Sequence, residues 1–317
     1  MKTVKQIITL LLVTVIFLSF DWCIYSFYTK RCISDYSKGM QAKSIETDKY
    51  LPFTEDSEIV KYDSSVKLSG DLPVLDGATA LYPVYSAFFN AVYPETAYEY
   101  GPDGFSKDSC LQLNNTLGAY KGIVDGSDDI VFCAKPSEKQ LQYAHDNGVQ
   151  LEMVPIGYEA FVFIVNKNNP VDDLSTDQIK GIYSGKYINW SDVGGPDKLI
   201  NPVTRKEGSG SQTAMLSFMS DQKIKKSPLA FLGRSIGFSY RYYVEGIVED
   251  SQIKMLKLNG VYPDKSSIQD GSYPIIGNLY AVYRKDNKNE NIRKLIDWIL
   301  SDEGQTIVEE SGYVRLK

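Results

Sequence analysis

The strongest constraint on the fold is an order of elements that recurs along the chain: a short apolar strand, a polar turn and an amphipathic helix. In the stretch DLPVLDGATALYPVYSAFFNAVYP, an apolar run ends at a turn around Gly77, and apolar residues then recur at helical spacing. The same order returns in DIVFCAK followed by PSEKQLQYAHDNG, where proline near the start and glycine at the end mark a helix. Such alternation predicts an α/β fold.

Length and composition narrow the function. A chain of 317 residues is longer than one typical domain and predicts two, each with its own core. Lys plus Arg total 34 against 40 for Asp plus Glu, so the net charge of -6 argues against nucleic acid as a partner. Only one histidine, His145, is present, and the four cysteines show no CxxC spacing. We therefore expect no metal, no cofactor and no Ser-His nucleophile.

The N-terminus differs from the rest of the chain. Two lysines precede an apolar run over residues 7–20, which predicts an export segment over residues 1–33. Neither a small-residue cleavage site nor the small residues expected before a lipidated Cys23 are present, so we favour an uncleaved membrane anchor over a cleaved or lipidated signal. The body then works outside the cytoplasm, where Cys110 and Cys133 could be oxidised, although the sequence leaves their pairing open.

Further segments can be assigned from their patterns. Residues 34–65 are polar, with little apolar periodicity beyond YLPF, and predict a stalk that docks late onto the globular body. LSTDQIKGIYSGK predicts a helix that begins with a Ser or Thr cap, and ENIRKLIDWILSDEGQTIVEESG predicts one or two amphipathic helices. LEMVPIGYEAFVFIVN predicts extended chain, and GFSYRYYVEG a partly buried strand.

Three loops combine glycine with hydroxyl residues ahead of a helix. TRKEGSGSQTAM holds Arg205, whose charged planar fork suits an anion, beside the hydroxyls of Ser209 and Ser211. DGATALYP and LNNTLGAY repeat this composition with Thr79 and Thr116. Helix N-termini add unpaired N–H groups and the positive end of the helix dipole. Each loop taken alone is equally explained as an ordinary turn or helix cap.

The sequence lacks the motifs of nucleotide-binding proteins and of serine hydrolases. GIYSGKY lacks the spacing of a nucleotide P-loop, and no GxGxxG follows a strand. Ser209 lies in EGSGS, which lacks the first glycine of a hydrolase nucleophile elbow, and no histidine is available to take its proton. We therefore expect a binding protein and not an enzyme, with a hydrolase using Ser209 as the weakest alternative.

The same stretches carry a resemblance to a known family. In order and spacing, the chain is similar to the substrate-binding proteins of phosphate ABC transporters, in the membrane-attached Gram-positive branch, through DGATALYP, DDIVFCAKPSEKQL, LSTDQIKGIYSGKYINWSDVGG, RKEGSGSQT and IGFSYRYY. The resemblance covers about residues 50–317. It implies a type II periplasmic-binding-protein fold, in which two α/β lobes joined by two crossing strands close on an anion in the cleft between them.

The resemblance also implies site residues. The first phosphate loop corresponds to Thr79 with its neighbouring amides, the second to Thr116, and the third to residues 205–211. Glu207 falls where the family often places a carboxylate that orients the arginine. The implied ligand-binding residues are Ala78, Thr79, Thr116, Arg205, Ser209, Gly210 and Ser211, and the supporting residues are Gly77, Asn115 and Glu207.

One position departs from the family. Where well-studied phosphate receptors have an Asp that accepts a hydrogen bond from protonated phosphate, this chain has Ala134. Without that acceptor, phosphate and sulfate should be poorly distinguished. Asp128 and Asp129 are nearby in sequence, but strand alternation does not guarantee that either can replace it.

The sequence thus predicts a solute-binding protein on the outer face of the cell membrane, which captures inorganic phosphate or a related oxyanion for an ABC permease and acts as a monomer. Lobe 1 is expected over residues 66–158 plus 273–317, and lobe 2 over 159–272. The alternative is a membrane-anchored anion sensor or scaffold with the same fold and no transport role.

Overall fold

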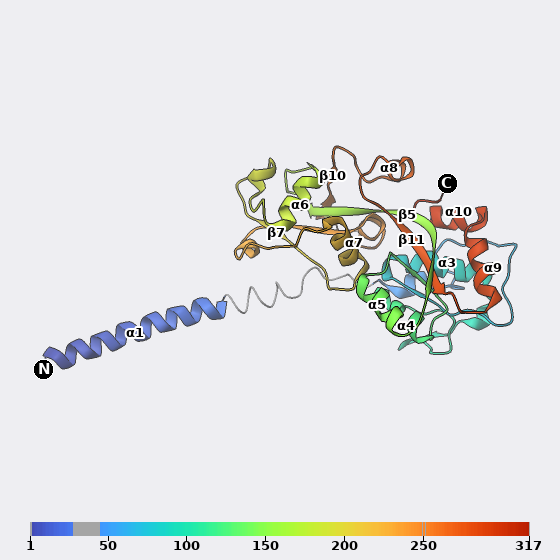
Figure 1. Cartoon of the computed structure of the whole chain (residues 1–317), viewed down its shortest axis with the longest axis horizontal. Helices are drawn as coiled ribbons and strands as arrows, with labels where there is room; N and C mark the ends of the chain where they lie inside the picture. Colours follow the sequence, from blue (N-terminus) through green and yellow to red (C-terminus); the bar gives the residue numbers. More distant parts are fainter. Residues whose placement is uncertain (1, 28–44, 249, 251, 317) are drawn as a thin grey trace. The chain divides into compact units, whose positions relative to one another are not determined.

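The computed structural model describes residues 2–27, 45–248, 250 and 252–316. The chain divides into two units, residues 1–41 and 42–317. The first contains the helix α1 (Lys2–Phe27), coloured dark blue in Figure 1. In the part of the chain described, no helix is long and apolar enough to cross a membrane. The rest of the expected export segment and the first part of the expected stalk fall on residues 28–44, outside the described residues.

The second unit, the body, is built on a mixed sheet. Within the described residues this sheet has seven strands in the order β1-β4-β11-β5-β8-β7, with β9 paired to β5. Parallel pairs lie at both edges, β1 with β4 and β7 with β8, and antiparallel pairs join them through β11 and β5. The strands are β1 (Leu75–Gly77), β4 (Ile130–Cys133), β5 (Leu151–Asn166), β7 (Ile200–Pro202), β8 (Arg234–Tyr240), β9 (Ile253–Met255) and β11 (Ile276–Arg284). Two short ladders pair β2 (Tyr100–Gly101) with β3 (Gly104–Phe105), and β6 (Asp173–Leu174) with β10 (Lys257–Leu258).

Helices connect and cover these strands. They are α3 (Tyr82–Val92), α4 (Asn115–Asp125), α5 (Glu138–Asp146), α6 (Thr176–Ser184), α7 (Gly210–Met219), α8 (Lys265–Asp270), α9 (Glu290–Ile299) and α10 (Asp302–Glu310). Short 3-10 turns are η2 (Thr47–Tyr50), η3 (Thr79–Leu81), η4 (Glu95–Ala97), η5 (Trp190–Val193) and η6 (Ala230–Leu232). The predicted hydroxyl cap of α6 is confirmed, because the Ser175 side chain accepts from Gln178 N in a capping box. The α/β fold is likewise confirmed.

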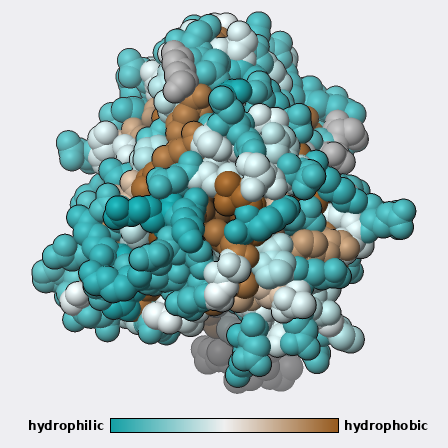
Figure 2. Space-filling view, turned by 90° about the vertical axis from the view of Figure 1, so that its right-hand side faces the viewer, coloured by the Kyte–Doolittle hydropathy of each residue, from teal (hydrophilic) through white to brown (hydrophobic). Residues whose placement is uncertain are grey.

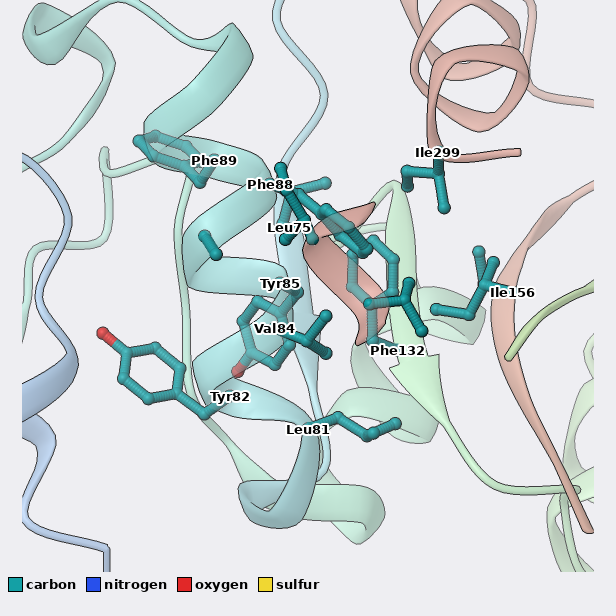
Figure 3. Close-up of a cluster of buried hydrophobic side chains, with 14 of the residues drawn as sticks. Leu75, Leu81, Tyr82, Val84, Tyr85, Phe88, Phe89, Phe132, Ile156 and Ile299 are labelled. Carbon is teal, nitrogen blue, oxygen red and sulfur yellow. The ribbon is translucent and has the colours of Figure 1, made fainter. Parts of the chain in front are cut away.

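Strands β5 and β11 pass through the body, with α4, α5 and α9 toward one end and α6 and α7 toward the other (Figure 1). Hydrophobic side chains gather in separate clusters at the two ends. Strand β5 contributes Ile156 to the first cluster and Phe161 and Phe163 to the second. Figure 3 shows part of the first cluster, where the rings of Tyr85 and Phe132 stack at a centroid distance of 5.3 Å. The surface in Figure 2 is mostly hydrophilic, with hydrophobic residues in small areas.

The described end of the expected stalk packs onto the body. Ile45, Tyr50 and Ile59 are buried in the first hydrophobic cluster. Ser86 Oγ in α3 donates a hydrogen bond to the Tyr50 carbonyl at 2.6 Å. The apolar residues of this segment are too widely spaced to form a periodic pattern, so the sequence predicted a polar stalk that docks late and did not identify these residues as part of the core.

Cys110 and Cys133 are both free thiols. Burial raises the pKa of each thiol above its ordinary value. Neither thiol therefore has the lowered pKa of a reactive cysteine.

The stretch GFSYRYYVEG is only half a strand, because β8 ends at Tyr240 and the chain enters the π-helix η7 (Tyr243–Val248). A buried ion pair fixes this change of direction. Arg241 Nε donates to Glu159 Oε1 at 3.2 Å, and Glu159 Oε2 accepts from the Tyr242 amide at 3.1 Å. Since Glu159 lies between the two parts of β5 that enter different clusters, the pair ties η7 to the crossing strand.

Candidate functional site

The N-terminal ends of α4 and α7 lie against each other. A Cβ placed on Gly210, the first residue of α7, would lie 3.7 Å from Thr116 Oγ1 and 3.7 Å from Ala134 Cβ. A Cβ on Gly208 would lie 2.5 Å from Leu117 Cδ2, and the φ of +80° at Gly208 also favours glycine. Two of the three expected anion loops therefore meet, and the unpaired amides of two helix starts lie close together.

Ser209 caps α7 with its own hydroxyl. Its Oγ accepts from Gln212 N at 3.3 Å and donates to the Lys206 carbonyl at 2.8 Å. Within the described residues, the amides of Gly210 and Ser211 have no hydrogen-bond acceptor, as is usual for the first turn of a helix. The donors that this loop offers to a ligand are therefore the amides of Gly210 and Ser211 and the Ser211 hydroxyl, and Ser209 holds the loop in shape.

Arg205 is held next to the same turn. Its backbone N donates to Gln212 Oε1 at 2.8 Å. Burial lowers the pKa of its guanidinium, and a hydrogen bond with Tyr243 opposes that effect. The ion pairs formed among the described residues include no carboxylate bound to Arg205. A half-buried guanidinium without a carboxylate is a charge that an anionic ligand can pair.

The first expected loop is positioned by the sheet. A Cβ on Gly77 would lie 2.6 Å from the Phe132 carbonyl oxygen and 2.8 Å from Tyr85 Cε1, so packing alone requires glycine there. The Ala78 amide donates to the Phe132 carbonyl at 2.8 Å and is thus used within the sheet. Thr79 begins the helical turn η3 that leads into α3, and its hydroxyl makes no hydrogen bond within the described residues. Of this loop, Thr79 is the residue with a donor to offer.

Asp76, which the sequence reasoning missed, joins the first loop to the second. Its Oδ1 accepts from the amides of Gly77 at 2.7 Å and Asn114 at 2.8 Å, and its Oδ2 accepts from Asn114 Nδ2 at 2.9 Å. Asn115 follows with a φ of 56°, and its Oδ1 accepts from the Leu117 amide at 3.1 Å. One buried carboxylate therefore fixes the loop before Thr79 and the start of α4. The signal available in the sequence was its position immediately before Gly77 at a strand end.

Glu207 does not orient Arg205 in this structure. Its carboxylate forms an ion pair with Lys139 Nζ of α5 at 2.8 Å, and both side chains are largely exposed. Glu207 is exposed and paired with Lys139, whereas Arg205 forms a hydrogen bond with Tyr243, so the expected contact between Glu207 and Arg205 is not formed.

Two tyrosines of the β8–η7 segment were also missed. Tyr240 Cε2 would lie 3.9 Å from a Cβ on Gly210, and the Tyr240 hydroxyl has no hydrogen-bond partner within the described residues. Tyr243 reaches Arg205 through its hydroxyl. Both positions depend on the pairing of β8 with β5 and β7, which no local sequence pattern reveals.

A family match covers most of the body. Residues 74–303 match a PBP superfamily domain. The chain belongs to the PBP superfamily. Among curated relatives, it is 28% identical over 180 residues to the phosphate-binding protein PstS of Borreliella burgdorferi, covering 50% of this chain and 64% of that protein. It is 28% identical over 220 residues to PstS of Staphylococcus epidermidis, covering 63% of this chain and 67% of that protein.

Two solved structures match the fold of this chain. A putative phosphate ABC transporter substrate-binding protein of Clostridium perfringens, solved with bound phosphate, matches with a TM-score of 0.59 and 26% identity over 77% of this chain and 99% of that one. An ABC-type phosphate transport receptor of Vibrio cholerae matches in fold, with a TM-score of 0.54 and 19% identity over 77% of this chain and 100% of that one. The predicted family resemblance is confirmed at this level.

Proposed function

We propose that this chain is a solute-binding protein that captures phosphate, or a similar tetrahedral oxyanion, for an ABC importer. The observation that carries the proposal is the meeting of two helix starts at Thr116 and Gly210, next to the turn of Arg205, whose guanidinium pairs with no carboxylate of the described residues. Similarity to PstS proteins and to a substrate-binding protein solved with phosphate supports the same ligand. The chain spans just under two thirds of the first of these PstS relatives.

The groups offered by the loops suit an anion. Arg205 supplies a charge and two parallel donors, and the amides of Gly210 and Ser211 add the positive end of α7. Hydroxyls of Thr79, Thr116 and Ser211 can donate to further oxygens. Ala78 holds the first loop to the sheet through its amide, and Ser209 caps α7. Gly77 and Asn115 support the loops. Binding breaks no bond of the ligand.

We assign lobes to residues 66–158 plus 273–317 and to residues 159–272, with the hinge at β5 and β11. Each hydrophobic cluster lies mainly in one of these lobes, but the first includes Tyr243 and Ile247 of the second lobe, and the second includes Tyr273 and Val314 of the first lobe. Binding would favour the closed arrangement because the anion then gains donors from both lobes. The Lys139–Glu207 ion pair and the contact of residue 208 with Leu117 join the expected lobes and would belong to that closed state.

The N-terminal segment supports a location outside the cytoplasm. The apolar run that follows two lysines would hold the body at the outer face of the membrane. There the chain, as a monomer, would present its ligand to a permease. A membrane-anchored anion sensor or scaffold with the same fold remains the second candidate, since Ala134 replaces the acceptor that strict phosphate receptors have.

Calorimetric titration with phosphate tests the proposal. The wild-type chain should bind one phosphate, Arg205→Ala should lose most of that affinity, and Arg293→Ala, which removes an exposed arginine from α9, should not. Retention of wild-type affinity in Arg205→Ala would exclude this site. Phosphate uptake by cells that lack the chain distinguishes the two candidates. Uptake should fall if the chain is part of an importer, and it should be unchanged if the chain is a sensor.

A further inference from the structure

A second buried carboxyl lies next to Asp76. Asp128 follows α4, is only 5% exposed and forms a hydrogen bond with Asp76, which is fully buried. Two carboxylates cannot both be ionised at hydrogen-bond distance in a buried place, so the pair shares one proton.

The surrounding chain is shaped around this pair. A Cβ on Gly122 of α4 would lie 1.9 Å from Asp128 Oδ2, so glycine is needed there to make room for the carboxyl. The Asp76 carboxylate uses its oxygens on the Gly77 amide and on the amide and side chain of Asn114. The proton therefore belongs on Asp128, which donates to Asp76 and leaves Asp76 as the acceptor that joins the two anion loops.

We propose that Asp128 is a positioning residue for the anion site, and that its shared proton with Asp76 keeps the Thr79 and Thr116 loops in place and makes anion capture weaken as that proton is lost. The inference rests on the proposed function and deepens it. Loss of the proton puts two like charges behind donors meant for an anion, and the repulsion both disturbs the loops and opposes the ligand.

The groups around the pair fit this role. Burial, followed by the charge of Asp76, raises the pKa of Asp128 to about 7, and burial also raises the pKa of Asp76. The described titratable groups that act on the pair are Asp129, Tyr85 of α3 and Cys133 of β4, and the Ser127 hydroxyl forms a hydrogen bond with Asp128. The guanidinium of Arg284 in β11 lies 3.6 Å from a Cβ placed on Gly126, two residues before Asp128. Tyr85 and Cys133 are neutral, and Arg284 is already paired with Asp286 at 2.9 Å. The proton is therefore the main compensation for the second charge.

The test compares wild type with Asp128→Asn in phosphate titrations between about pH 6 and about pH 8.5. The amide of Asp128→Asn can donate to Asp76 at every pH. Because both proteins bind the same phosphate at each pH, the ratio of their dissociation constants cancels the titration of phosphate itself. We expect similar affinities at the acidic end and a wild-type loss of roughly three- to tenfold relative to Asp128→Asn at the alkaline end. Asp128→Leu, which removes the donor, should bind weakly throughout, and Asp125→Asn, an exposed change on α4, should follow wild type.

Parallel pH profiles for wild type and Asp128→Asn would overturn the inference. So would an Asp128→Leu variant that folds and binds like wild type. If wild type bound no phosphate at any pH, the proposed function would fail. The shared proton would then be tested by thermal melting of wild type and Asp128→Asn. Because the pKa of Asp128 is raised to about 7 in the folded chain, a melting difference between wild type and Asp128→Asn that grows from about pH 4 to about pH 7 and is constant above it supports the shared proton. A difference that is constant over the whole range contradicts it.

Discussion

Glu207 and Lys139 form an ion pair of 2.8 Å that joins the loop before α7 to α5. Both side chains are more than two thirds exposed, at 69% and 78%, so the pair should contribute little. We expect Glu207→Gln to change phosphate affinity by less than about threefold, with any effect in the dissociation rate. Stopped-flow and calorimetric titrations measure both quantities. A loss as large as that of Arg205→Ala would mean that Glu207 orients the arginine when the ligand is bound.

Arg205 should dominate the affinity. Removing a charge-assisted fork from a half-buried site is expected to cost on the order of 2 to 4 kcal/mol of binding free energy. Arg205→Lys should restore only part, because an ammonium cannot reproduce the planar fork. Tyr243→Phe removes the hydroxyl that holds the guanidinium and should cause a smaller loss. Equal affinities for wild type and Arg205→Ala would remove Arg205 from the site.

Ala134 should limit selectivity. Its Cβ lies 3.7 Å from a Cβ placed on Gly210, and Asp128 is hydrogen-bonded to Asp76, so neither supplies an acceptor for a ligand proton. We expect the ratio of phosphate to sulfate affinity to be below about 100, less than roughly 3 kcal/mol. Ala134→Asp should increase the ratio, and Ala134→Asn, of similar size without the charge, should not. Competition titrations at neutral pH decide this, and a much higher wild-type ratio would show that another acceptor exists.

The crossing of β5 should depend on the Glu159–Arg241 pair. Arg241→Ala leaves the Glu159 carboxylate, 1% exposed, without its charge partner, and should cost about 3 to 5 kcal/mol of the free energy of unfolding. Glu245→Ala removes the other, half-exposed partner of Arg241 and should cost below about 1 kcal/mol. Denaturant unfolding measures both, and equal small losses would show that the pair does not stabilise the crossing.

Gly122 should be required by Asp128. Gly122→Ala should cost about 1 to 3 kcal/mol through overpacking, and adding Asp128→Ala should reduce that effect of the alanine, because the clashing carboxyl is gone. Gly101→Ala is the matched control, since a Cβ there would meet nothing within 4 Å. Additive losses in the double variant would place the strain elsewhere.

The local features of the fold were predictable from the sequence. Strand, turn and helix around Gly77, and the hydroxyl cap of α6, follow from patterns within a few residues, and the structure contains both. The family resemblance added the order of the three loops. The predictions of strand, turn, helix and cap succeeded because these features depend on neighbours in sequence.

Partners across long sequence distances were not predictable. Asp76 and Asn114 are 38 residues apart, and Arg241 lies 82 residues from Glu159. Three further features depend on which elements the sheet brings together: the ion pair of Glu207 with Lys139, the π-helix after Tyr240 and the burial of Ile45. Such contacts carry no local pattern, so composition and spacing leave them open.

The most direct test of the account is a structure of the chain crystallised with phosphate. The anion should lie between the starts of α4 and α7, with Arg205 and the amides of Gly210 and Ser211 within hydrogen-bond distance of its oxygens. Phosphate bound elsewhere on the body, with Arg205 and the amide of Gly210 turned away from it, would contradict the account.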